Sequence, residues 1–371
     1  MLTFEFSDTE YSNRKIQTLA LAAELGCDSV IAFGENRSGV AVTYLTGWSV
    51  TRAAVCAIDR NDTHLWIQFP NHVPYARRIL RDCAIHELHG DWIQDLFSGR
   101  SSRVATLGPV DPRVRKHADT NGIALIPMDK EHAGLRMIKS NEEIAALQLG
   151  GSVSDIAAQA LIDACVPGTS DWDLLAAAKD AYTRAGGRDY ICYICVTDMH
   201  NPDRDVPSQF PEGRVLSKGS VVTFELSAAI APEYPGQILR TVSLGEPIDP
   251  YPFLIAVAEL VKADIKSAIT PGVNTQELIL ISQTIENSGF TTTDDLFHGF
   301  GMGYLEPVGT SSSRTPRHSP NMDLSAGMAL VIQPNVTLID HSAGVQTGEL
   351  VVVTSTGIAD MHTLPTGLIT V

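Results

Sequence analysis

An eight-residue pattern that occurs twice limits the folds open to this chain. Residues 167–174 and 271–278 both read P-G-x-[S/N]-x-x-[D/E]-L, and the two copies start 104 positions apart. Each copy places a good N-cap residue, Ser170 or Asn274, at the start of a predicted helix. Glycines follow both predicted helices, where helices commonly end. The repeat predicts that this part of the chain contains two related structural halves.

The residues before this repeat follow a different pattern. Helical apolar spacing runs over residues 13–25, and residues 29–33 and 53–58 are short apolar runs typical of buried strands. Alternating helices and strands of this kind indicate an α/β domain. No phosphate-binding loop or dinucleotide-binding pattern accompanies them.

A helix start marks the expected domain boundary. Ser140 and Glu143 form a capping-box pattern that opens an amphipathic helix. We therefore predict a smaller domain over residues 1–134 and a larger domain over residues 135–371.

Charge and hydropathy exclude two classes of partner. The chain has 43 acidic residues against 27 Lys and Arg, a formal net charge of −16. Nucleic acids and anionic membranes require a basic face, so we expect neither as a partner. No apolar run approaches the roughly 20 residues that a membrane helix needs. The first residues also lack a signal-peptide pattern, so we expect a cytoplasmic protein.

The one C-x-x-C pair does not predict a metal or redox site. Cys192 and Cys195 lie in an apolar run, residues 190–196, that is typical of a strand. Side chains three positions apart on a strand point to opposite faces, so the two thiols are not expected to meet.

Four segments of the larger domain place polar residues inside strand-like runs. They are residues 223–227 (TFELS), 237–241 (QILRT), 298–301 (HGFG) and 331–335 (VIQPN). With the R-x-x-K-S-x-x-E-I pattern at residues 136–144, they resemble the pita-bread family, which includes aminopeptidase P, prolidase and creatinase. The resemblance implies an α+β fold, in which a pita-bread domain with pseudo-twofold duplication follows a smaller α/β domain.

The peptidases of that family hold two metal ions with five side chains. At the matching positions this chain has Glu225, Gln237, His298, Gln333 and Gly348. Divalent metals favour anionic or imidazole ligands, and an amide is a poor replacement. We therefore expect no bound metal and no other cofactor. A shift of one residue would bring Glu349 to the last position, which leaves open a metal-dependent Xaa-Pro dipeptidase with altered ligands.

Two members of the family, creatinase and ectoine hydrolase, act without metal. Residues 223–225 and 239–245 are similar to the corresponding segments of ectoine hydrolase. The resemblance implies that Glu225 attacks an electrophilic carbon directly or activates a water molecule. We expect metal-independent hydrolysis of a C–N bond in a small polar amidine, lactam or amide. A lyase, a cyclase and a non-catalytic binding protein on the same fold stay open.

The resemblance also suggests roles for four neighbouring residues. His298 is a candidate general acid or hydrogen-bond donor. Gln237 and Gln333 are candidates for orienting the substrate, because amides both donate and accept hydrogen bonds. Arg240 is suited to binding a substrate carboxylate, and pairing with a structural acid is the alternative.

Four further residues complete the predicted site. His200 and Glu349 are candidate substrate contacts. Trp48 and Arg52 lie in a segment that closes over the partner subunit's active site in creatinase-like dimers, so the resemblance implies a homodimer. Arg314, Arg317 and His318 are expected in a solvated loop near the pocket mouth.

Overall fold

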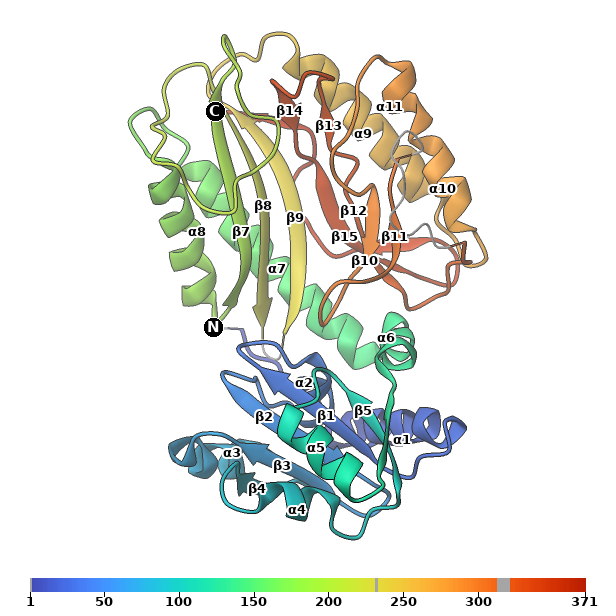
Figure 1. The fold of residues 1–371 in the computed structure, drawn as a ribbon. Coiled ribbons are helices and arrows are strands. Elements are labelled where there is room, and N and C mark those ends of the chain that lie inside the picture. Colours follow the sequence, from blue (N-terminus) through green and yellow to red (C-terminus); the bar gives the residue numbers. More distant parts are fainter. Residues whose placement is uncertain (1, 231–232, 312–320) are drawn as a thin grey trace. The chain divides into compact units, whose positions relative to one another are not determined.

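The computed structural model describes residues 2–230, 233–311 and 321–371. The chain forms two compact units, and the change from one to the other falls between Arg136 and Met137. The residues before Glu5 belong to the larger, C-terminal unit. Figure 1 shows the elements of both units, which are described separately below.

The smaller unit is an α/β domain, as the alternating sequence pattern predicts. Its strands form a mixed sheet in the order β4-β3-β2-β1-β5-β6. The elements are α1 (Asp8–Glu24), β1 (Val30–Glu35), α2 (Val40–Thr46), β2 (Ala53–Ile58), β3 (Thr63–Ile67), α3 (Val73–Ile79), β4 (Ala84–Glu87), α4 (Trp92–Phe97), β5 (Arg103–Leu107), α5 (Pro112–Thr120) and β6 (Ala124–Pro127). The first helix begins earlier than predicted because Ser7 caps it, accepting a hydrogen bond from the Glu10 amide.

The larger unit is built on one long, mainly antiparallel sheet in the order β11-β10-β12-β15-β9-β8-β7. Its helices are α7 (Asn141–Asp163), α8 (Asp171–Ala185), α9 (Tyr251–Ala268), α10 (Thr275–Ile281) and α11 (Gln283–Asn287), and α6 (Asp129–Met137) leads into it. Its strands are β7 (Arg188–Asp198), β8 (Ser220–Ile230), β9 (Tyr234–Ser243), β10 (Phe297–Gly299), β11 (Leu305–Gly309), β12 (Ala329–Ile332), β13 (Val336–Thr337), β14 (Gly344–Val345), β15 (Gly348–Val353), β16 (Ile358–Asp360) and β17 (Leu368–Thr370).

The repeated sequence pattern marks corresponding helices in the two halves of this unit. Ser170 and Asp173 form a capping box at the start of α8, and Asn274 and Glu277 form one at the start of α10. The second helix departs from the prediction, because it is interrupted at Ser282 and continues as α11. Among the described residues, no helix is long and apolar enough to cross a membrane.

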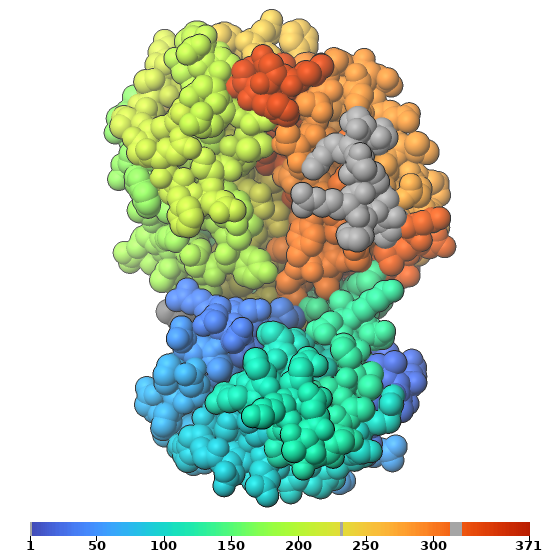
Figure 2. Space-filling view, viewed as in Figure 1, coloured from blue at the N-terminus to red at the C-terminus, as the bar shows by residue number. Residues whose placement is uncertain are grey.

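Each half of the sheet packs one face against its own helices. Phe224, Leu226 and Ile238 of β8 and β9 share an apolar core with residues of α7 and α8. In the other half, Leu330 and Ile332 of β12 share a core with residues of α9, α10 and α11. We call this side of the sheet the helix face and the opposite side the site face. Figure 2 shows the yellow-green residues of the first half beside the orange residues of the second.

Three glycines allow α7 to lie directly on β9. A Cβ atom on Gly236 would lie 2.6 Å from the carbonyl carbon of Gly150, and it would also overlap the backbone of Gly151. Real Cβ atoms do not approach backbone atoms this closely, so the helix and the strand are in contact through their main chains. This contact sets the packing distance between β9 and α7.

We predict that Gly236→Ala destabilises the larger unit by roughly 3 kcal/mol or more, because the backbone of α7 must move to admit the methyl group. Gly134→Ala is the matched control, since a Cβ there meets no atom within 4 Å and the residue lies in helix α6. Alanine should be neutral or stabilising at that position. Chemical denaturation of both variants measures the difference. Equal stabilities would show that α7 and β9 are not in main-chain contact.

Candidate functional site

The strand register places the predicted site residues on two opposite faces of the sheet. Tyr193, Glu225 and Leu239 lie directly opposite one another on β7, β8 and β9, and Gly348 of β15 lies opposite Leu239. Side chains at directly opposite positions point to the same side of a sheet. The neighbours Phe224 and Ile238 belong to the helix-face core, so Glu225 points to the site face.

Four of the predicted residues form one hydrogen-bonded chain on the site face. The Gln237 side-chain amide donates to Glu225 Oε1 at 2.8 Å and to Gln333 Oε1 at 3.0 Å. The Gln333 side chain in turn hydrogen-bonds to His298. The two glutamines therefore connect the carboxylate to the imidazole, at positions where the peptidases of the resembled family have metal ligands.

The Glu225 carboxyl group is strongly perturbed. Burial raises its pKa to about 8, and the negative charge of Asp294 acts in the same direction. The side chain nevertheless keeps partial exposure, so it is within reach of a ligand. A carboxyl group with this pKa exchanges a proton near neutral pH, which an ordinary surface glutamate does not.

His298 is held as a neutral imidazole. Burial lowers its pKa to about 4, against the opposing effects of Gly299, Asp295 and Gln333. Its Nδ1 lies 3.2 Å from the carbonyl oxygen of Gly299, so this nitrogen carries the proton and donates it. The hydrogen bond to the Gly299 carbonyl thus orients the ring, which in turn holds Gln333. Because its pKa is lowered, the imidazole is not protonated at neutral pH and cannot act as a general acid in the way an imidazolium does.

The space beside Gly348 is filled by its neighbours. A Cβ atom at this position would lie 2.8 Å from Cδ1 of Leu239 and 2.9 Å from Cβ of Gln333. The Leu239 side chain and the missing side chain at Gly348 are therefore complementary, and no carboxylate fits at residue 348 without displacing its neighbours.

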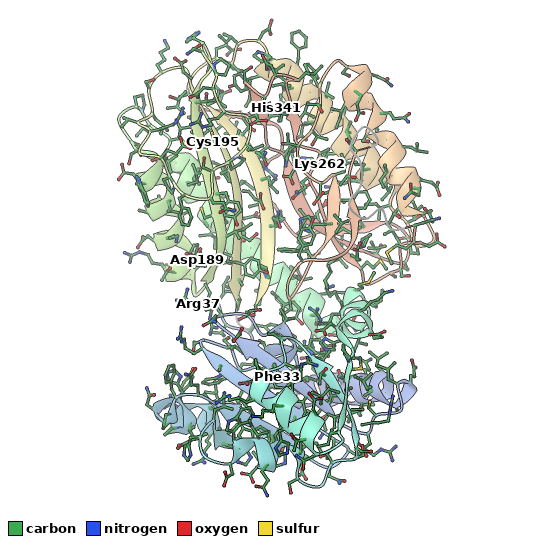
Figure 3. The ribbon with its side chains drawn as sticks, in the orientation of Figure 1. Phe33, Arg37, Asp189, Cys195, Lys262 and His341 are labelled. Carbon is green, nitrogen blue, oxygen red and sulfur yellow. The ribbon has the colours of Figure 1, made fainter. Side chains whose placement is uncertain are left out.

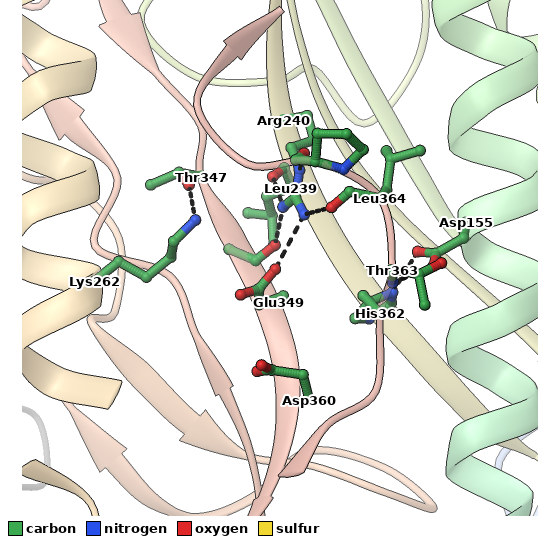
Figure 4. A network of polar contacts seen from close by, with 12 residues as sticks. Asp155, Leu239, Arg240, Lys262, Thr347, Glu349, Asp360, His362, Thr363 and Leu364 are labelled. Carbon is green, nitrogen blue, oxygen red and sulfur yellow. Dashed lines mark hydrogen bonds and ion pairs between the residues drawn. The ribbon is translucent and has the colours of Figure 1, made fainter. Parts of the chain in front are cut away.

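Arg240 lies on the helix face, away from Glu225. Its guanidinium donates to the carbonyl oxygens of Leu239, Gly348, Leu364 and Pro365 and to Glu349 Oε2, at 2.7–3.0 Å. These contacts engage all five of its N–H groups. The predicted role in binding a substrate carboxylate is therefore not retained, because the fully buried guanidinium has no donor left. The alternative expectation, that Arg240 pairs with a structural acid, agrees with its contact to Glu349 (Figure 4).

Glu349 belongs to the same cluster of charges. Lys266 contacts its Oε1 at 2.5 Å, and Lys262 lies nearby on the same helix, α9. Burial acts to raise the pKa of Glu349, but Lys262, Arg240 and Lys266 outweigh it and lower that pKa to about 2. A cavity of about 450 Å³ opens over Lys262 and Lys266. Glu349 thus points to the helix face. Gly348, and not Glu349, therefore occupies the site-face position that was matched to the last metal ligand.

The remaining predicted residues lie elsewhere. His200 is exposed in the turn that follows β7, where it lies beside Gly219, the residue directly before β8. Trp48 and Arg52 belong to the smaller unit: Trp48 is buried near His72 and Tyr75, and Arg52 is exposed and bonds to Asn36. Their role in a homodimer stays a prediction. Arg314, Arg317 and His318 lie outside the described residues.

Cys192 and Cys195 lie on strand β7, as predicted from the apolar run around them. Cys192 lies opposite Leu226 and Cys195 lies opposite Thr223, and these two partners point to different faces of the sheet. Both thiols are free and buried, and Cys195 is marked in Figure 3. They form neither a disulfide nor a shared site.

Three polar residues beside Glu225 or His298 were missed by sequence reasoning. Tyr193 is its direct cross-strand neighbour, and Asp294 acts on its charge. Tyr304 stacks on the His298 ring with centroids 4.1 Å apart. The adjacent acids Asp294 and Asp295, just before the HGFG segment, were the available signal for this part of the site.

Comparisons with known proteins agree with this fold. The family model described as metallopeptidase family M24 matches residues 145–355. A probable dipeptidase, PepE, from Mycobacterium tuberculosis is 24% identical over 258 residues, which are 68% of this chain and 66% of that protein. The chain thus spans just under two thirds of that relative. An uncharacterized peptidase, YqhT, from Bacillus subtilis is 24% identical over 91% of this chain and 94% of its own length. The crystal structure of an X-Pro aminopeptidase from Thermotoga maritima has a TM-score of 0.82 at 18% identity, covering 96% of this chain and 99% of that one.

The residues at the ligand positions do not fit the metal ions that the family name implies. Glu225 and His298 are the only anionic or imidazole side chains at the five positions, and they are separated by two amides. In the described part of the chain, no group of three or more His, Cys, Asp and Glu side chains is arranged to hold a metal ion. Tight binding of a divalent metal needs more such donors.

We predict that Arg240→Lys lowers the stability of the larger unit by about 2–4 kcal/mol, because the three N–H groups of an ammonium cannot replace the five of the guanidinium and leave buried acceptors unsatisfied. Arg52→Lys, at an exposed site with one hydrogen bond, is the control and should change stability by less than about 0.5 kcal/mol. Urea denaturation tests both. Similar effects in the two variants would contradict the five-donor arrangement of Arg240.

The raised pKa of Glu225 predicts a pH dependence of stability. The folded chain keeps this proton between the ordinary pKa of a glutamate, 4.5, and about 8, whereas the unfolded chain loses it. The native state then binds more protons, so its stability falls as pH rises through this window. Glu225→Gln should remove a decline on the order of 3 kcal/mol between pH 5 and pH 9. Denaturation curves across this range measure it, with exposed Glu246→Gln as control. Parallel profiles for wild type and Glu225→Gln would rule out the raised pKa.

Proposed function

Because the chain belongs to metallopeptidase family M24 while its ligand positions do not fit a metal pair, we propose that it is a metal-independent hydrolase. Its substrate would be a small polar amidine, lactam or amide, cleaved at a C–N bond. One observation carries the proposal. Glu225 is a partly exposed carboxyl group with a pKa near 8, held by a glutamine amide at a position where the peptidases hold metal.

The pKa of Glu225 suits it to both halves of a hydrolysis. As a base, its carboxylate takes a proton from a water molecule while the water oxygen bonds to the substrate carbon. As the C–N bond breaks, the same carboxyl group gives this proton to the leaving nitrogen. A group whose pKa lies near the working pH performs both transfers efficiently. Direct attack by Glu225 on the carbon, followed by hydrolysis of the enzyme-bound intermediate, is the covalent form of the same proposal.

The neighbouring residues have supporting roles in this proposal. Gln237 fixes one oxygen of Glu225, which leaves the other for water or substrate. Gln333 fixes Gln237 and is itself held by His298. His298 therefore acts as a positioning residue, since its lowered pKa makes it a weak acceptor of protons at neutral pH. Similarity to creatinase and ectoine hydrolase supports chemistry without metal. A homodimer in which Trp48 and Arg52 reach the partner's site remains part of the proposal.

The second candidate is a metal-dependent dipeptidase of the Xaa-Pro type. The names of the relatives favour it, because they include a probable dipeptidase and an X-Pro aminopeptidase. The altered donor set argues against it. The two candidates differ in metal content, in sensitivity to chelators and in substrate.

Metal analysis combined with turnover separates the two candidates. We predict that purified protein holds no stoichiometric metal, and that its activity on a panel of cyclic amidines, lactams and dipeptides survives exhaustive chelation. Glu225→Gln should lower kcat/KM by roughly 1,000-fold or more, because the group that moves the proton is lost.

Two results would decide against this proposal. Tightly bound metal together with chelator-sensitive dipeptide cleavage would establish the dipeptidase. Full activity in Glu225→Gln would remove the residue from the mechanism. Glu246→Gln, an exposed change of the same chemistry, is the control and should leave turnover unchanged.

A further inference from the structure

The side chain of Gln346 is buried without a hydrogen-bond partner. The residue is 1% exposed, and among the described residues neither its Oε1 nor its Nε2 meets a donor or an acceptor. Its backbone, in contrast, is bonded at both ends: the Thr241 hydroxyl accepts from the Gln346 N–H at 2.8 Å and donates to the Gln346 carbonyl at 2.9 Å. Buried side-chain amides are nearly always paired, because an unpaired one keeps its full desolvation cost. The folded chain therefore holds an amide whose partner has to come from outside.

Alternation along the chain directs this amide to the site face. Gln346 lies in the short connection between β14 and β15. Its neighbour Val345 shares the apolar core of α9, and the hydroxyl of its other neighbour, Thr347, accepts from Lys262 of α9 at 2.7 Å. A residue between two such positions in an extended segment points the opposite way. Gln346 thus points away from α9, to the same side as Gly348.

Thr241 connects the amide to the proposed catalytic centre. It lies opposite Thr223 on β8, and Thr223 is two positions from Glu225 on the same face of that strand. Because the Thr241 hydroxyl is bonded to the backbone of Gln346, the unpaired amide and the Glu225 carboxyl group belong to one region of the site face.

The segment that follows β7 covers this side of β14. A Cβ atom on Gly344 would lie 2.2 Å from the carbonyl oxygen of Asp205, so the backbone of that segment rests directly on the strand. Nδ1 of His341 lies 2.9 Å from Oδ2 of Asp205 and ties the segment to the turn between β13 and β14. The hydroxyl of Thr337, opposite Gly344, is a second buried group without a partner in the described part of the chain. A ligand reaches Gln346 when this segment moves aside.

We infer that Gln346 is a specificity-determining residue that binds an amide group of the substrate, with an N–H donor and a C=O acceptor side by side, as in a lactam or a primary carboxamide. The inference rests on the proposed function of the same site and narrows its substrate class. An amidinium presents only donors and a carboxylate only acceptors, so each leaves one polar atom of Gln346 unpaired. An amide pairs with both atoms at once and removes the desolvation cost that the free protein carries.

Three small probes of similar shape test the inference by binding alone. 2-Pyrrolidinone is a lactam with a donor and an acceptor, cyclopentanone keeps only the acceptor, and 2-iminopyrrolidine is a cation at pH 7 with donors only. Ligand-observed NMR titration of chelator-treated wild-type protein should show the lactam binding at least about tenfold more tightly than either analogue. Comparable binding of the lactam and cyclopentanone would overturn the inference, as would a preference for 2-iminopyrrolidine or no binding of the lactam at about 50 mM.

Removing the amide should change binding and stability in opposite directions. Gln346→Met keeps the length of the side chain and removes both polar atoms. It should weaken 2-pyrrolidinone at least about tenfold, to the level of cyclopentanone, and raise the urea midpoint of the free protein, because a buried unpaired amide is lost. Gln148→Met, at an exposed position of α7, is the control and should alter neither property. A lower urea midpoint or an unchanged lactam affinity in Gln346→Met would make Gln346 a structural residue and overturn the inference.

The binding results are independent of turnover. A lactam preference that Gln346→Met abolishes, without any chelator-resistant hydrolysis, would keep the binding site and reject the proposed reaction. Metal-free hydrolysis with the same kcat/KM in wild type and in Gln346→Met would keep the reaction and reject the role of Gln346.

Discussion

The guanidinium of Arg240 joins the parts of the larger unit that must stay in register for the site to exist. It ties β9 to the start of β15 through the Gly348 carbonyl, and to the C-terminal segment through Leu364 and Pro365. Its partner Glu349 is bound in turn by Lys266 of α9, so the second half of the unit is attached to the same point. A buried pair of this kind is costly to form, but removing one member leaves a charge unpaired inside the protein. The strand positions of Gln237 and Gly348 are thus fixed by contacts on the helix face, opposite the face that carries Glu225.

Alternation along the strands then separates two polar groups that are mixed in the sequence. Gln237 and Arg240 are three residues apart on β9, and Gly348 and Glu349 are adjacent on β15, so the members of each pair point to opposite faces. On the helix face, acids and bases balance and hold the fold. On the site face, the carboxylate of Glu225 meets amides, aromatic rings and another acid. The same short segments therefore supply the ion pairs of the helix face and the polar residues of the site face.

Much of this was accessible from the sequence, and the failures have specific causes. The repeated helix starts and the strand that carries Glu225 follow from capping residues and apolar runs, which are local signals. The pita-bread fold was implied by the resemblance of several motifs to a known family. Arg240 was assigned to the substrate because a motif does not state which face a residue occupies, and its partners lie more than 100 positions away. His200 stays a prediction, because the sequence does not give the direction in which a loop side chain points. Tyr193 and Tyr304 had no signal of their own, because only the folded chain brings Tyr193 beside Glu225 and Tyr304 onto the His298 ring. Asp294 had only the weak signal of two adjacent acids.

The exchange at Leu239 and Gly348 explains why the site is not a metallopeptidase centre with one ligand missing. A side chain at residue 348 would collide with Leu239 and Gln333, so a carboxylate cannot be restored there alone. Gln237 donates to both Glu225 and Gln333, so a carboxylate in place of Gln237 would repel Glu225 and leave Gln333 without this donor. The Gln237 amide thus holds Glu225 by hydrogen bonding, and burial of the carboxyl group raises its pKa. A glutamate in such surroundings exchanges protons at neutral pH, and this is the property that the proposed hydrolysis requires.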